Sequence, residues 1–288
     1  MPHAHELMRD DFILVDVDDT VASLIGQIAR HEDCVAVVLD GTTYKGMADK
    51  RWLLASRIDP SGMKLKNLIT HRSKSKTQFY VPKLAPDTDL KEICRLMATA
   101  DVHALPVIVS ENKKEKVVGV VHALDVIKEL RSAYKGVKAE DIASMRVITI
   151  DQDDEVGKAM NVMNKQGIGH VVVVDSKGKL VGILTLTDIL LDVQRFPRIN
   201  VRLPRAASHQ KGKHTGFGIG EKQDILKLPV HNILTHVPNC STVAPEDPVA
   251  SAIDEMVEKG IASIVLIRKD VPVGIITVKD ILQDFGKA

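Results

Sequence analysis

Two short segments place a threonine and an aspartate three positions apart, directly after an apolar stretch. They read GILTLTD at residues 182–188 and GIITVKD at residues 274–280. The apolar stretch is typical of a strand, and the aspartate then falls in the first turn of a following helix. A carboxylate there can accept hydrogen bonds from both hydroxyls of a ribose, and helix N-termini favour phosphate. The residue pairs, which suit an adenosine nucleotide, are Thr185 with Asp188 and Thr277 with Asp280.

A simpler interpretation is that these aspartates only cap their helices, and both interpretations stay open at this stage. A third segment, GVVHALD, ends at Asp125 but has His122 in place of the hydroxyl residue. A fourth, GMADKRW, has Asp49 where threonine is expected and Trp52 where aspartate is expected. Because a carboxylate repels phosphate, the fourth segment predicts an empty site that serves packing. The third segment keeps the carboxylate and is expected to bind.

The four segments belong to a fourfold internal repeat. Each copy reads as a short strand, a helix with apolar residues at 3–4 spacing, two strands joined by a tight turn, and a second helix. Four glycines mark the copies at spacings of 73, 63 and 92 residues: Gly46, Gly119, Gly182 and Gly274. The surplus over 63 is 10 and 29 residues, which matches two polar insertions at 71–80 and 194–222. Gly182 is expected to let another backbone approach closely.

This β-α-β-β-α order, with the Gly-x-x-[Ser/Thr]-x-x-Asp pattern on its last turn, resembles the CBS domain, a family named for cystathionine β-synthase. The resemblance implies an α+β/α/β fold in which four CBS repeats pair into two tandem disc-like modules. Pairing also has a physical reason, because one small unit buries only one face of its sheet. The expected boundaries are repeat 1 at 1–57, repeat 2 at 63–130 with the insert 71–80, repeat 3 at 138–193, the basic insert at 194–226, and repeat 4 at 227–288.

The resemblance implies roles for single residues: the aspartate on the ribose, the threonine near the α-phosphate, and an apolar slot for adenine. Nucleotide-sensing relatives often carry His or Arg at the start of the third strand, where this chain has His103 and His170. A lone histidine is more often a satisfied core or rim residue than a ligand. Few cations occupy the expected phosphate positions, which leaves AMP, adenosine-like ligands, S-adenosylmethionine, or no ligand.

The sequence carries no recognisable catalytic constellation, since GxSxG, HExxH and Walker motifs are absent. We therefore expect a binding protein rather than an enzyme, with no required cofactor and no metal. Three cysteines without a CxxC predict reduced thiols in or near the core. No signal peptide and no run long enough to span a bilayer is present, so the expected location is the cytoplasm, with no membrane partner. Pairing of two chains into a homodimer stays open.

The insertion at 194–222 is basic and rich in glycine, although the whole chain has a net charge of only +1. It reads either as a disordered linker or as an arm that contacts RNA phosphates, with an aromatic ring for stacking. The other insertion, HRSKSKTQFY, has a similar composition. The residues expected to bind RNA are Arg195, Arg198, Arg202, Arg205, Lys211, Lys213, Phe217, Lys222, Arg72, Lys74 and Lys76.

Two functions from different classes follow from these patterns. In the first, the protein binds an adenosine nucleotide and controls a partner. In the second, it binds ribosomal RNA or a ribosomal subunit, as a hibernation or dormancy factor that uses its CBS discs as a scaffold. Ribosome-bound factors built from four CBS domains are known in archaea, and this chain resembles them in architecture.

Overall fold

The computed structural model describes residues 1–30, 35–49, 64–67, 82–111, 114–189, 225–236 and 240–287. Both polar insertions, 71–80 and 194–222, lie outside these ranges, and so do all the residues expected to bind RNA.

Repeat 3 shows the structural unit. Strand β6 (Thr149–Asp151) runs parallel to β7 (His170–Val174), and helix α8 (Val156–Gln166) connects them. β7 is antiparallel to β8 (Leu180–Thr185), which leads into the helical turn that carries Asp188. The parallel pair requires a crossover helix, whereas the antiparallel pair needs only a tight turn. The unit therefore ends with the candidate motif at the exit of its third strand.

Repeats 1 and 4 repeat this order, whereas in repeat 2 the first strand is reduced to a single parallel bridge between Leu84 and Val107. Repeat 1 contains β1 (Ile13–Asp16), α2 (Val21–Arg30), β2 (Val35–Asp40) and β3 (Thr43–Asp49). Repeat 2 contains α5 (Leu90–Ala100), β4 (Ala104–Glu111), β5 (Lys114–His122) and α6 (Ala123–Leu130). Repeat 4 contains β10 (Thr242–Val243), α10 (Val249–Lys259), β11 (Ser263–Arg268), β12 (Val271–Thr277) and α11 (Val278–Lys287).

Three of the four marker glycines, Gly119, Gly182 and Gly274, make room for a neighbouring segment, whereas no described atom lies within 4 Å of a methyl group added to Gly46. A methyl group added to Gly182 would lie 2.2 Å from the carbonyl oxygen of Thr235, as the sequence predicted for this position. At Gly119 it would lie 2.6 Å from the sulfur of Met8, and at Gly274 it would lie 2.9 Å from the sulfur of Met145. Such distances exclude a side chain unless the neighbour moves.

The segments that lie against these glycines come from the start of the other repeat of the same pair. Helix α1 (Ala4–Leu7) precedes repeat 1 but packs on repeat 2, where the Ala4 amide donates to the Thr88 carbonyl at 2.8 Å. Helix α7 (Ala139–Ile142) precedes repeat 3 but packs on repeat 4, with the Ala139 amide donating to Asp247 at 2.8 Å. The same exchange holds for residues 64–67 on repeat 1, and for η2 (Ile225–Lys227), η3 (Val230–Asn232) and β9 (Thr235–His236) on repeat 3.

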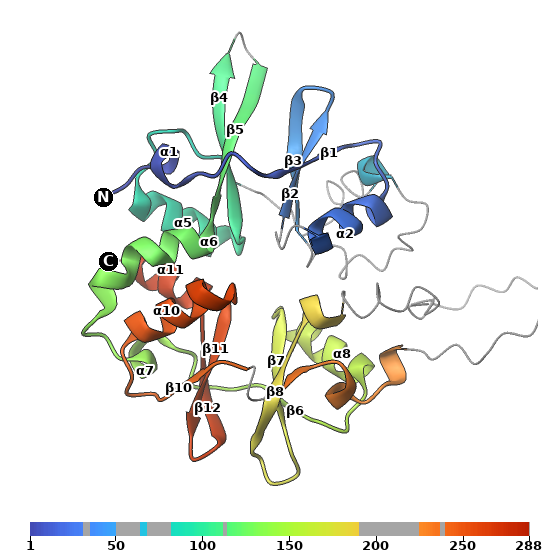
Figure 1. Cartoon of the computed structure of the whole chain (residues 1–288), viewed down its shortest axis with the longest axis vertical. Coiled ribbons are helices and arrows are strands. Elements are labelled where there is room, and N and C mark those ends of the chain that lie inside the picture. The colour runs from blue at the N-terminus through green and yellow to red at the C-terminus, as the bar shows by residue number, and fades with distance from the viewer. Residues whose placement is uncertain are drawn as a thin grey trace, which may run out of the picture.

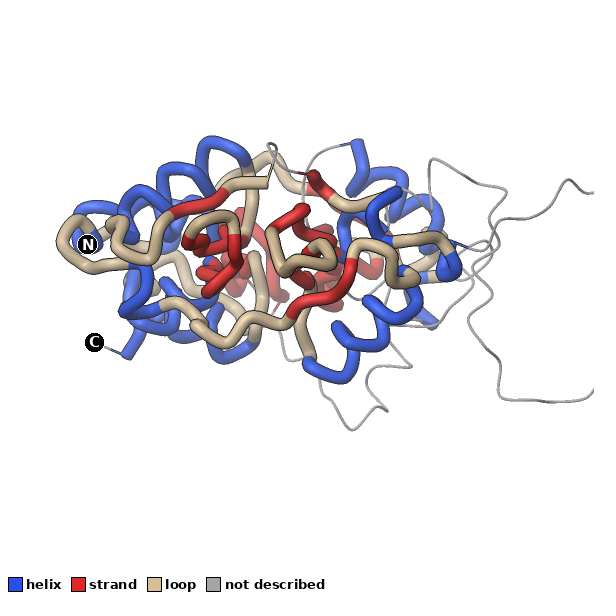
Figure 2. The backbone as a smooth tube through the Cα atoms, turned by 90° about the horizontal axis from the view of Figure 1, so that it is seen from below, coloured by secondary structure: helices blue, strands red, loops and turns tan. Residues whose placement is uncertain are grey.

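Sheets hold the repeats of each pair together. Repeats 1 and 2 share a cluster that includes Val37, Met47 and Val120, and repeats 3 and 4 share one that includes Val172 and Val265. The pairs form two halves in Figure 1, with repeat 2 beside repeat 4 and repeat 1 beside repeat 3. Seen edge-on, strands occupy the middle and helices lie toward the outer sides (Figure 2). The chain thus forms two tandem modules, as the resemblance implied.

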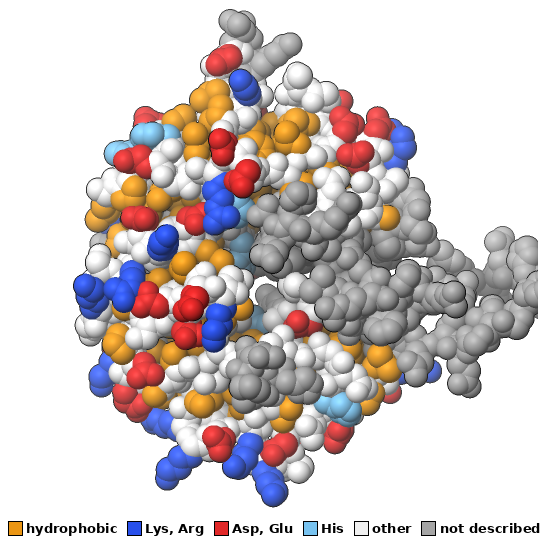
Figure 3. Space-filling model, in the orientation of Figure 1, with side chains coloured by type: hydrophobic (Ala, Val, Ile, Leu, Met, Phe, Trp, Pro, Cys, Tyr) orange, Lys and Arg blue, Asp and Glu red, His pale blue; other side chains and the backbone are white. Residues whose placement is uncertain are grey.

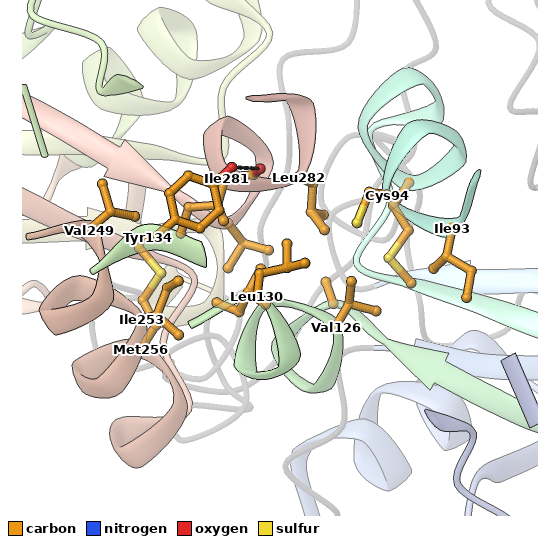
Figure 4. Packing of buried hydrophobic residues seen from close by; sticks show 14 of the residues in the cluster. Ile93, Cys94, Val126, Leu130, Tyr134, Val249, Ile253, Met256, Ile281 and Leu282 are labelled. Atoms are coloured by element: carbon orange, nitrogen blue, oxygen red, sulfur yellow. Dashed lines mark hydrogen bonds between the residues drawn. The ribbon is translucent and has the colours of Figure 1, made fainter. Parts of the chain in front are cut away.

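Helices join the two modules. A single apolar core runs from α5 and α6 of repeat 2 into α10 and α11 of repeat 4 (Figure 4). The connecting 3₁₀ turn η1 (Arg131–Tyr134) inserts Tyr134, whose hydroxyl donates to the Asp284 carboxylate at 2.8 Å. Next to it, Arg131 forms an ion pair with Asp254 of α10. A second ion pair crosses the interface at 2.9 Å between Lys279 and Asp101.

Of the three cysteines predicted to be reduced thiols, Cys94 and Cys240 are free, and Cys34 lies outside the described residues. Burial raises the pKa of Cys94 to about 12 and that of Cys240 to about 11. In the described ranges no helix is long and apolar enough to cross a bilayer.

Positive and negative side chains are interspersed over the surface of repeats 2 and 4 (Figure 3). Arg268, for example, contacts Glu246 at 2.5 Å and Glu140 at 3.2 Å.

Candidate functional site

Thr185 and Asp188 lie at the exit of β8 and bond to each other. The Thr185 hydroxyl donates to Asp188 Oδ2 at 2.7 Å, and the Thr185 amide donates to the same oxygen at 2.8 Å. The Asp188 amide donates back to the Thr185 hydroxyl at 3.2 Å. This reciprocal arrangement caps the helical turn, so the capping role is confirmed. The second carboxylate oxygen, Oδ1, accepts from the hydroxyl of Thr235 at 3.2 Å.

Repeat 4 has the same geometry with one oxygen left over. The Thr277 hydroxyl and amide donate to Asp280 Oδ2 at 2.6 and 2.8 Å. Among the described residues, none is recorded as donating to Asp280 Oδ1. Burial raises the pKa of Asp280, although the bonds from Thr277 oppose this effect. A partly desolvated carboxylate with an unused acceptor is a site that a hydroxyl donor can satisfy.

Repeat 2 keeps the carboxylate but gives it a different partner. Arg9 Nε donates to Asp125 Oδ2 at 2.7 Å, and Arg9 Nη2 donates to Oδ1 at 2.8 Å. The guanidinium therefore engages both oxygens of the aspartate that was expected to bind ribose. His122, at the end of β5, occupies the position of Thr185 and Thr277 and makes no side-chain cap on α6.

Repeat 1 was expected to be empty. Asp49 ends β3, but its side chain and Trp52 lie outside what the structure describes. The expectation for repeat 1 stays a prediction.

In repeats 2 and 3 the side chain that bonds to the aspartate comes from the exchanged segment, and sequence reasoning missed it. Arg9, Ser144 and Thr235 each pair with the residue after a marker glycine: Arg9 with Val120, Ser144 with Ile275, and Thr235 with Ile183. Arg9 and Thr235 bond to the local aspartate, whereas no such bond is recorded for Ser144. A signal was available in the stretches HAHELMR, KAEDIAS and PVHNILT, which share an apolar residue before the facing position.

The two candidate phosphate-binding histidines occupy different positions of the repeat. In repeat 2 the amide of Ala123 donates to the carbonyl of His103 at 2.8 Å. The equivalent bond of repeat 3 runs from the amide of Leu186 to the carbonyl of Gly169 at 3.0 Å, so His103 corresponds to Gly169. His170 is therefore one residue further along than His103, and it pairs with Thr185 across β7 and β8. Because strand side chains alternate, His170 lies on the same face as Val172, toward repeat 4.

His170 predicts a pH effect on stability. Burial lowers its pKa from 6.5 to about 4, so the folded protein keeps this imidazole neutral where the unfolded chain already binds a proton. The free energy of unfolding should therefore fall by up to about 3 kcal/mol as the pH drops from about 6.5 to about 4. The variant His170→Ala, which has the residue found at the equivalent position of repeat 2 (Ala104), should lose less free energy of unfolding between about pH 6.5 and about pH 4. Urea unfolding at several pH values measures both slopes, and parallel slopes would contradict the prediction.

Comparison with known proteins agrees with this architecture. The CBS domain family model matches residues 79–132, 139–194 and 230–286, which is more than half of the chain. Protein MJ1404 of Methanocaldococcus jannaschii is 27% identical over 284 residues, covering 96% of this chain and 60% of that protein. Inosine-5′-monophosphate dehydrogenase of Thermoplasma acidophilum is 33% identical over 114 residues, 40% of this chain and 22% of the enzyme. MJ1232 of M. jannaschii is 34% identical over 113 residues, 39% of this chain and 36% of that protein. In each case the aligned part covers less than two thirds of the relative.

Two solved structures share the fold along nearly the whole chain. One is protein MJ1225 of M. jannaschii, described as a proposed archaeal homologue of γ-AMPK, with a TM-score of 0.74, 17% identity, and coverage of 99% of this chain and 100% of that one. The other is a protein of Pyrococcus horikoshii, with a TM-score of 0.60, 19% identity and the same coverage. The family model misses repeat 1, yet repeat 1 has the same strand order and pairing as repeats 3 and 4. The chain belongs to the CBS domain family.

Proposed function

We propose that the protein is a regulatory, non-catalytic protein that binds an adenosine-containing nucleotide in repeats 3 and 4 and thereby controls a partner. The observation that carries the proposal is the Asp280 carboxylate, with Oδ2 fixed by Thr277 and Oδ1 available. A ribose offers two adjacent hydroxyl donors, which match such a carboxylate. Asp188 has the same arrangement, with the Thr235 hydroxyl on Oδ1 at 3.2 Å as a weak bond that a ligand can replace.

AMP-like ligands and S-adenosylmethionine fit this chemistry better than nucleoside triphosphates. Lys279, beside Asp280, is already paired with Asp101 at 2.9 Å, so it is not a surplus cation for a phosphate chain. Burial lowers the pKa of His170 to about 4, which keeps it neutral near pH 7, where it can bond to a phosphate but not balance its charge.

Calorimetric titration of the purified protein with AMP, ATP and S-adenosylmethionine tests the proposal. We expect saturable binding of AMP or S-adenosylmethionine and weaker binding of ATP. If none of the three binds at millimolar concentration, the proposed function is wrong.

The second candidate function, binding to ribosomal RNA, depends on the basic insertion. The tract 194–222 carries seven Lys and Arg residues and a single acid, Glu221, which suits contact with a phosphate backbone. We expect ribosome co-sedimentation at low salt that is lost at high salt, and lost also when the seven basic residues are changed to serine. Serine in place of Arg72, Lys74 and Lys76 tests the smaller insertion separately. Pelleting that is unchanged in the seven-residue variant would leave the tract as a linker.

A further inference from the structure

The corresponding carboxylate has a different environment in each of three repeats. At Asp280 one oxygen is available, at Asp188 a threonine hydroxyl donates to it, and at Asp125 a guanidinium covers both oxygens. Arg9 and Thr235 occupy the same position of the exchanged segment, which in repeat 4 is occupied by Ser144, with no recorded bond to Asp280. The aspartate itself is common to the three repeats, so the different partners of Asp125 and Asp188 come from the residue that the exchanged segment supplies.

We propose that Arg9 closes repeat 2 to nucleosides by occupying the carboxylate of Asp125. This inference rests on the proposed function and refines it. Repeats 3 and 4 would bind adenosine compounds, whereas repeat 2 would not, although it retains the aspartate.

The contact between Arg9 and Asp125 uses both oxygens of the carboxylate. Two parallel N–H donors at 2.7 and 2.8 Å satisfy both carboxylate oxygens and neutralise their charge. Ribose hydroxyls are neutral donors, so a ligand would have to displace a charged, bidentate partner to reach the same oxygens. The ion pair is only partly exposed, with 46% of the Arg9 side chain and 28% of the Asp125 side chain accessible.

The backbone that carries Arg9 is fixed on repeat 2. Its amide donates to the Val120 carbonyl and its carbonyl accepts the Val120 amide, both at 2.9 Å. Met8, just before it, lies against Gly119, and Ala4 is completely buried in the core shared by repeats 2 and 4. Because four contacts position the chain, the guanidinium reaches Asp125 at little conformational cost.

A second change in repeat 2 acts in the same direction. His122 replaces the threonine whose hydroxyl and amide orient Asp188 and Asp280 in the other repeats. A test of Arg9 must therefore also restore this hydroxyl.

The experiment measures ligand binding to repeat 2 in the full-length chain, after the candidate sites of repeats 3 and 4 have been removed. Asp188→Ala and Asp280→Ala together remove the other two sites, and calorimetry with adenosine and with AMP then reports repeat 2. We expect no binding in this background, no gain on adding H122T, and a new site of one per chain on adding R9S with H122T. R146S with H122T is the matched control, because Arg146 is exposed and has no recorded partner within the described ranges. It should gain nothing.

The outcomes separate this inference from the proposed function. If the wild-type chain binds neither adenosine nor AMP, the proposed function fails. If the wild-type chain binds but R9S with H122T adds no site, or if repeat 2 already binds with Arg9 in place, the assignment of Arg9 is wrong. A gain of binding would also show that Arg9 acts by occupying Asp125 and not only by holding α1 in place, because a variant that merely loosens α1 would not create a binding site.

Discussion

The double variant Asp188→Ala/Asp280→Ala is expected to lose binding of adenosine nucleotides, and each single variant is expected to lose one site. Each carboxylate would supply two charge-assisted bonds to a ribose, and hydrogen bonds to charged groups contribute about 1.5–3 kcal/mol each. Two such bonds together contribute at least about 3 kcal/mol, so we expect the affinity of the altered repeat to fall at least about 100-fold. Calorimetric titration with AMP and S-adenosylmethionine gives both the affinity and the number of sites.

The matched control for these variants is Asp270→Ala. Asp270 is exposed, pairs with Lys179 at 3.2 Å, and lies in the turn at the far end of β12 from Thr277. It should bind as the wild type does. Intact binding in the double variant would show that the ligand lies elsewhere.

The binding of a nucleotide to repeat 4 should also depend on pH. Burial raises the pKa of Asp280, and the ionised carboxylate is the form that accepts both hydroxyls, so acidification should weaken binding at a higher pH than for an ordinary aspartate.

Leu130→Ala is expected to cause the largest loss of stability among these changes. Leu130 is 1% exposed and lies in the core that joins repeats 2 and 4, near Ile253 and Met256 of α10 (Figure 4). Removing a buried leucine side chain costs about 2–5 kcal/mol, since the lost apolar contacts leave a cavity. Because the cavity lies between modules, the two modules should also begin to unfold separately.

Urea denaturation followed by circular dichroism measures this effect, with Leu14→Ala as the control. Leu14 is 53% exposed and should contribute little when shortened. A Leu130→Ala variant that unfolds within about 1 kcal/mol of the wild type would contradict a continuous core between the modules.

Local patterns predicted the repeats and the strand–helix turns because their signals lie within a few residues. The mutual bonds of Thr185 and Asp188 span three positions, and the close approach at Gly182 needs only the absence of a side chain. Each of these could be read from one segment of the chain.

The facing residues could not be predicted in the same way, because they come from the other repeat of the pair. Arg9 is 116 positions from Asp125, and no local rule indicates that the two side chains meet. The offset between His103 and His170 was missed for a related reason. The alignment of the two repeats is fixed by the backbone bonds of Ala123 and Leu186, which the sequence does not reveal. A shift of one residue along a strand places its side chain on the opposite face of the sheet.

The exchange of segments has a consequence for how the protein is made. A chain emerges from the ribosome N-terminus first, at about 5–20 residues per second. Ala4 bonds to Thr88 in repeat 2, so the segment that completes repeat 2 is synthesised on the order of 4 to 17 seconds before its partner. Repeat 1 in turn receives residues 64–67 only after its own strands are finished. The unit that can finish folding during synthesis is therefore the pair, and a nascent chain that stops after one repeat exposes a surface that only the second repeat can cover.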